Sequence, residues 1–94
     1  MNHSAAVILL ASLLAAGPVA AEDFTIQPGD TLARTVALQK GKTVTLKLVS
    51  GEELTGTVKM VTDAAAQLSG LAGKEYFDGV VPIDKIEAML IRTK

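Results

Sequence analysis

Cysteine is absent from this chain, and histidine occurs once, as His3 near the amino terminus. Without cysteine the protein has no disulfide, no thiol nucleophile and no acylated cysteine that could anchor it as a lipoprotein. His3 lies in a segment that the amino-terminal pattern predicts to be removed, so the remaining chain also lacks a histidine base and the ligands of common zinc sites. We therefore expect a protein that is not an enzyme and holds no metal or cofactor.

An excess of charge of either sign is also missing. Nine Lys and Arg residues and ten Asp and Glu residues give a formal net charge of −1, and they are interspersed, with no basic stretch and no acidic tail. Nucleic-acid-binding proteins usually carry a basic face, so this balance argues against nucleic acid as a partner. Glu52 and Glu53 come nearest to a carboxylate pair, but adjacent strand residues point to opposite faces, so we expect a solvated turn there.

What the sequence does contain is an amino-terminal apolar segment with the layout of a secretory signal peptide. An unbroken apolar run from Ala5 to Ala16 is followed by Gly17 and Pro18, which break helices, and by small residues up to Ala21. As a helix, Ala5 to Ala21 would span roughly 25 Å, less than the roughly 30 Å hydrocarbon core of a bilayer. We predict cleavage after Ala21, a periplasmic or secreted location, and no stable membrane insertion of the remaining chain. A retained anchor is the alternative, since no Lys or Arg precedes the apolar run.

Turn residues and alternating apolar positions divide the rest of the chain into one helix and five strands. Residues 24–30 predict an extended piece and a turn, after which Asp30 or Thr31 caps a short helix over 31–39. Gly56 stands in an inward slot of the second strand, where a missing side chain permits a sharp bend. Alternation predicts strands at 43–49, 54–62, 75–83 and 86–92, and a third strand follows Asp63 and ends at Gly70 or Gly73.

These elements predict a mainly β fold, in which a short N-terminal α-helix is followed by a five-stranded, strongly bent antiparallel small barrel of the SH3-like size range. The chain divides into a signal peptide (1–21), an extended segment with the helix (22–41) and the small barrel (42–94). A single domain of this size has a marginal core, and without disulfides or metal such domains often gain stability by assembling. We therefore expect a homo-oligomer.

The last two strands hold the candidate interface. Ile86, Ala88 and Leu90 are expected to face the core, which leaves the apolar Met89 and Ile91 on the opposite face. A terminal strand with two apolar faces is either covered by the helix or paired with a neighbouring chain. In the fourth strand we expect Phe77 in the core and Tyr76 partly exposed. The candidate oligomer interface consists of Val80, Met89 and Ile91.

Residues 42–94 resemble the Sm-like (LSm) family of small β-barrels. The matching residues are the run VTLKLVSGEELTGTV, with Gly51 and Gly56 spaced as in the family's first motif, then Asp63 and the closing strand IEAMLIR. The resemblance implies a short amino-terminal helix and a bent five-stranded sheet. It also implies rings closed by pairing of the fourth and fifth strands between subunits.

The same resemblance points to a ligand loop at Asp63 and Gln67, with a departure from the RNA-binding members. Those members have an aromatic residue two positions after the Asp and an Asn two positions further on, where this chain has Ala65 and Gln67. Stacking of a base on an aromatic ring contributes about 1–3 kcal/mol. Without that ring, RNA binding is not the expected activity and remains an alternative.

A second, shorter resemblance lies at the start of the exported chain. Residues 24–37 (FTIQPGDTLARTVA) are similar to the opening of a LysM repeat, whose family implies peptidoglycan binding. The second helix and Asn-containing middle of that repeat are absent, and Pro28 to Thr31 would also serve as an efficient turn and helix cap. The sequence thus favours a non-catalytic, self-assembling binding or scaffolding unit, with a cell-wall-binding module and an RNA-binding Sm-like protein as alternatives.

Overall fold

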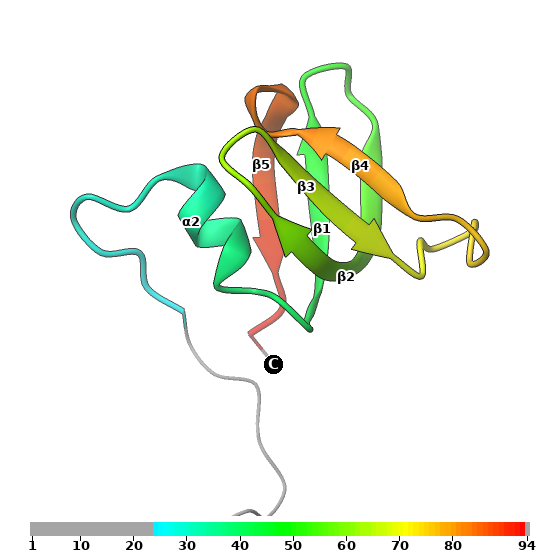
Figure 1. Ribbon diagram of the computed structural model, residues 1–94, viewed down its shortest axis with the longest axis horizontal. Coiled ribbons are helices and arrows are strands. Elements are labelled where there is room, and N and C mark those ends of the chain that lie inside the picture. Colours follow the sequence, from blue (N-terminus) through cyan, green and yellow to red (C-terminus); the bar gives the residue numbers. More distant parts are fainter. Residues whose placement is uncertain (1–23, 94) are drawn as a thin grey trace, which may run out of the picture.

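The computed structural model of the protein describes residues 24–93, so the predicted signal peptide and its cleavage site at Ala21 lie outside the described residues. Figure 1 shows a helix, α2 (Leu32–Ala37), followed by a single curved sheet. The mainly β fold with a short helix before the strands is confirmed. The strands are β1 (Thr43–Leu48), β2 (Glu53–Val61), β3 (Ala65–Ser69), β4 (Gly79–Pro82) and β5 (Ile86–Ile91).

The helix α2 begins at the turn that the sequence predicts. The Thr31 hydroxyl accepts a hydrogen bond from the backbone N–H of Arg34 at 3.1 Å, and this satisfies one of the free amides of the first turn. Asp30 accepts from the backbone N–H of Gln27 at 2.8 Å and pairs with the Arg34 side chain at 3.2 Å. The segment that resembles a LysM opening therefore serves in this fold as a turn and a helix cap.

The sheet is antiparallel throughout and strongly bent. Its strand order is β4-β3-β2-β1-β5, and in Figure 1 β3 and β4 cross in front of β1. The chain packs closely at Gly56 of β2, where a Cβ atom would lie 2.8 Å from the carbonyl oxygen of Ser69 and 3.0 Å from Leu71 Cδ2. Glycine permits this close approach because it has no side chain. The inward slot predicted for Gly56 is confirmed, since the residue is buried.

The expectation of a barrel is wrong, because the sheet stays open. Within residues 24–93, β4 pairs with β3 alone and β5 with β1 alone, so these two strands form the edges. β4 has only four residues and ends at Pro82, which has no N–H to donate. A 3₁₀ turn, Ile83–Lys85, then leads directly into β5. Such a short fourth strand offers few hydrogen-bonding groups with which to close the sheet.

The core lies between the sheet and α2, which packs against β2 and β3. Val36 of α2 and Leu46 of β1 are both fully buried. Burial of these side chains away from water is the main favourable term in folding. The buried apolar residues are Val36, Val44, Leu46, Val58, Ala66, Leu68, Leu71, Val81 and Ile86.

Two β-bulges reverse the alternation of inward and outward residues. In β2 the register shifts between Val58 and Met60, so that Met60 is 51% exposed and Val61 packs on the core. A second shift, at Lys47/Leu48, changes the pairing of β1 with β5. Each bulge adds a residue on one strand, and a one-residue slip moves every later side chain to the other face.

Candidate functional site

The candidate interface residues of β4 and β5 do not share one surface. Val80 of β4 is 68% exposed, as an interface residue should be. Met89 and Ile91 lie opposite Leu46 and Val44 of β1 and pack against the core. The outward residue of β5 is Leu90, which is 55% exposed, so the expectation that Leu90 faces the core is wrong.

Leu90 lies at an open groove where β1 begins and β5 ends. The groove has a volume of about 510 Å³ and runs over the start of β1, the facing part of β2 and the end of β5. Thr45 and Thr55 line it, and their hydroxyls are hydrogen bonded to each other at 2.7 Å. Thr43, Leu90 and Arg92 also line it. The groove thus combines an apolar wall with hydroxyl groups and one cationic residue.

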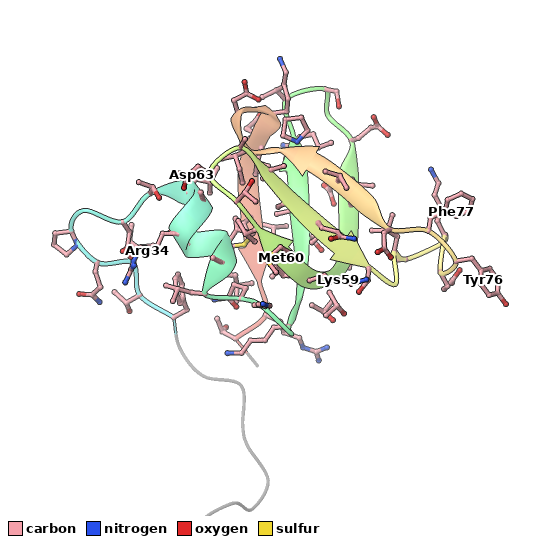
Figure 2. All side chains as sticks on the ribbon, in the orientation of Figure 1. Arg34, Lys59, Met60, Asp63, Tyr76 and Phe77 are labelled. Atoms are coloured by element: carbon pink, nitrogen blue, oxygen red, sulfur yellow. The ribbon has the colours of Figure 1, made fainter. Side chains whose placement is uncertain are left out.

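An exposed pair of aromatic side chains stands on the connection between β3 and β4, residues 70–78, here called the aromatic loop. Tyr76 is fully exposed and Phe77 is 64% exposed, and Figure 2 shows both at the tip of the loop, far from the helix. The expectations of a core position for Phe77 and of a fourth strand from residue 75 are therefore wrong. The clue in the sequence is the dense spacing of Gly70, Gly73 and Gly79, which is typical of a loop.

The aromatic loop is held to the sheet at both of its ends. Leu71 is buried in the core, and its carbonyl accepts from the backbone N–H of Lys74 at 2.9 Å. At the other end, Asp78 Oδ2 accepts from Gln67 Nε2 at 2.9 Å and lies 3.4 Å from Lys59 Nζ. The aromatic pair is thus presented on an anchored loop.

The two residues of the candidate ligand loop have different surroundings. Gln67 is in the middle of β3, between Met60 and Val80 in the sheet, and its side-chain amide is bonded to Asp78. Asp63 is exposed in the turn between β2 and β3. It lines a small cavity of about 140 Å³ beside α2 that Arg34 also lines. Figure 2 shows Asp63 next to α2, on the side of the sheet away from the aromatic loop.

We expect the Asp78→Ala substitution to lower the free energy of unfolding by no more than about 1 kcal/mol, because Asp78 and Lys59 form a solvent-exposed ion pair. The loop should also become easier to cleave, since one of its two anchors is lost. Chemical denaturation and limited proteolysis between residues 74 and 77 measure the two effects. A Lys59→Ala variant, which leaves the Gln67 bond intact, is the control. A loss above 2 kcal/mol, or unchanged cleavage, would contradict this view of the loop.

Residues 24–93 contain no grouping of three or more His, Cys, Asp or Glu side chains that could hold a metal ion. No helix in this part of the chain has the length and apolar character needed to cross a bilayer. Large apolar side chains, by contrast, reach the surface at several points. Those on or beside the two edge strands are Phe77, Val80 and Leu90.

Comparisons of the chain with family models, with curated proteins and with solved structures found no match. Its function is therefore inferred from the sheet edges, the groove and the aromatic loop described above.

Proposed function

We propose that the protein is an exported, non-catalytic unit that assembles with copies of itself and acts as a binding or scaffolding protein. In this proposal residues 1–21 direct export to the periplasm or the medium and are removed. The observation that carries the proposal is the open sheet, whose two edges belong to different strands, β4 and β5. An unpaired edge presents free backbone N–H and C=O groups that another strand can bind.

The two edges differ from each other, which determines the kind of assembly. When β4 of one copy pairs with β5 of the next, the pair still has one free β5 edge and one free β4 edge, so the contact is heterologous and repeats. Such a contact closes into a ring if the rotation between neighbours allows it. The Sm-like resemblance of residues 42–94 implies the same pairing of fourth and fifth strands, and it supports this choice of edges.

Exposed apolar side chains beside the edges give the contact a second source of affinity. Val80 of β4 and Leu90 of β5 are 68% and 55% exposed, although each belongs to a strand of the sheet. Natural proteins commonly protect free edges with charged residues or proline. β4 has Pro82 at its end, whereas Val80 leaves the middle of the strand without such protection. Pairing of β4 with β5 of a neighbouring copy would bury the side chains of Val80 and Leu90 away from water.

The test is native mass spectrometry of the full chain, expressed with its leader and purified as the host processes it. We expect an oligomer of defined copy number for the wild type. A Val80→Asp variant should require at least about tenfold more protein for half-assembly, equivalent to about 1.4 kcal/mol, because a charge on the edge opposes pairing. A Val49→Asp variant is the matched control, since Val49 is 57% exposed and lies outside β4 and β5.

Two results would overturn the proposal. One is a wild-type protein that remains a monomer at every concentration. The other is equal assembly of the Val80→Asp and Val49→Asp variants, which would remove β4 from the contact. The mass of the processed chain, read in the same spectrum, tests cleavage after Ala21, and a chain that still begins at Met1 would contradict the predicted processing.

A further inference from the structure

The aromatic loop exposes two of the three aromatic residues of the entire chain. Phenylalanine and tyrosine bury about 150–250 Å² each when they enter a core or an interface, so burial of the exposed surface of Tyr76 and Phe77 against a partner would be favourable. The loop is anchored to the sheet by Leu71 and Asp78. This combination of a supported loop and an exposed aromatic tip is typical of a side-chain pair that docks into a partner.

The groove beside Leu90 has the size and lining to receive such a pair. Its volume of about 510 Å³ falls within the roughly 300–1,000 Å³ of concave binding sites in proteins. Leu90 provides an apolar wall for a ring, and the hydroxyls of Thr43 and Thr55 can bond the tyrosine O–H. The chain therefore carries both an aromatic tip and a groove that suits it, on different parts of its surface.

The edge contact proposed above brings the two together. Every pairing in the sheet is antiparallel, and an antiparallel contact between β4 and β5 of neighbouring copies places the start of β4 beside the end of β5. Tyr76 and Phe77 precede the first residue of β4, Gly79, by at most three residues, a reach of about 10 Å. The groove lies at the last residues of β5 and just beyond them, at Leu90 and Arg92.

We propose that Tyr76 and Phe77 of one copy dock into the Leu90 groove of the next copy and set the orientation of the assembly. This inference rests on the proposed self-assembly. Charge favours a second copy as the occupant: Glu75 precedes the aromatic pair, and Arg92 lines the groove.

Because the chain has no cysteine, introduced cysteines report the contact directly. Phe77→Cys and Thr43→Cys variants of the full chain, one isotopically labelled, are processed by the host, mixed and oxidised. We expect a disulfide-linked mixed dimer, recognised by its mass. The control replaces Thr43→Cys by Ser50→Cys, since Ser50 follows the opposite end of β1. The mixed dimer should form at least about tenfold more with Thr43→Cys than with Ser50→Cys.

A second measurement tests the contribution of the aromatic pair to affinity. The Tyr76→Ser/Phe77→Ser double variant should need at least about tenfold more protein for half-assembly. Ile26→Ser is the matched control, because Ile26 and Phe77 are both 64% exposed and Ile26 lies outside the loop and the groove. Circular dichroism should show the same fold in all variants.

The outcomes separate this inference from the proposed function. A wild-type protein that never assembles overturns both. Assembly with equal cross-linking to Thr43→Cys and Ser50→Cys, or with dimers linked only between two Phe77→Cys copies, overturns the docking inference and leaves edge pairing intact. A double variant that assembles normally but loses retention on lipid vesicles or on peptidoglycan also overturns it, since the pair then serves another partner.

Discussion

Replacement of Leu46 by alanine is expected to lower the free energy of unfolding by about 2–5 kcal/mol. Leu46 is fully buried in β1, where it lies opposite Leu54 of β2 and Met89 of β5. The shorter side chain leaves a cavity in the middle of the core, which the hydrogen-bonded strands on both sides cannot collapse to fill. A small domain has only about 5–15 kcal/mol of total stability, so this loss is a large share.

Urea denaturation at one fixed protein concentration measures the Leu46→Ala effect, because assembly would make stability depend on concentration. The matched control is Leu38→Ala, since Leu38 is 51% exposed at the end of α2 and its removal should change stability by less than about 0.5 kcal/mol. Equal effects of the two substitutions would contradict the position of the core.

Replacement of Gly56 by alanine is expected to cost about 1–3 kcal/mol. A methyl group at this position would lie 2.8 Å from the carbonyl oxygen of Ser69, which is a backbone atom of the paired strand β3. To accommodate it, β2 and β3 must separate at this position. Apolar side chains that pack around this position would lose contact with one another.

Gly79→Ala is the matched control for Gly56→Ala. A methyl group at Gly79 would meet only side-chain atoms, with Leu71 Cδ1 at 3.3 Å and Leu54 Cδ1 at 3.9 Å, so a small shift of the Leu71 side chain accommodates it. We expect a smaller loss of stability for Gly79→Ala than for Gly56→Ala in the same denaturation experiment. A larger loss of stability for Gly79→Ala than for Gly56→Ala would contradict the importance of the close approach between Gly56 and the Ser69 carbonyl.

The sequence predicts best those elements whose signals are local. The cap at Thr31 and the turn at Asp30 follow from side chains that bond to nearby backbone amides. The regular alternation from Val44 to Leu48 predicts β1, because that strand is covered on one face only. Gly56 stands out because it occupies a slot that an apolar residue would otherwise fill.

The sequence does not predict which face the later strand residues occupy. Ile86 faces the core opposite Leu48, and the register shift that follows places Ala88 opposite Lys47. From that point Met89 rather than Leu90 faces the core. The shift comes from pairing with β1, a strand far away in the sequence, so no alternation within residues 86–91 reveals it.

The aromatic loop and the open sheet are not predicted from the sequence, because they too depend on how strands pair. Tyr76 and Phe77 have strand propensity, and an apolar residue in a short run is usually assigned to a core. Whether a core is available to Phe77 depends on how far β3 and β4 pair, and their pairing ends at Gly79. Of the candidate interface residues only Val80 is exposed, whereas Met89 and Ile91 pack against the core and Leu90 and the aromatic pair reach the surface.

The short length of β4 has a consequence for how an assembly through it would behave. With four residues, the last of them Pro82, this strand can add only a brief ladder of hydrogen bonds to a six-residue β5. Each junction between protomers would then be the weakest line in the continuous sheet. Dilution would dissociate the assembly into folded protomers rather than unfolded chains. Rings would exchange subunits with one another, and each subunit would stay folded during the exchange.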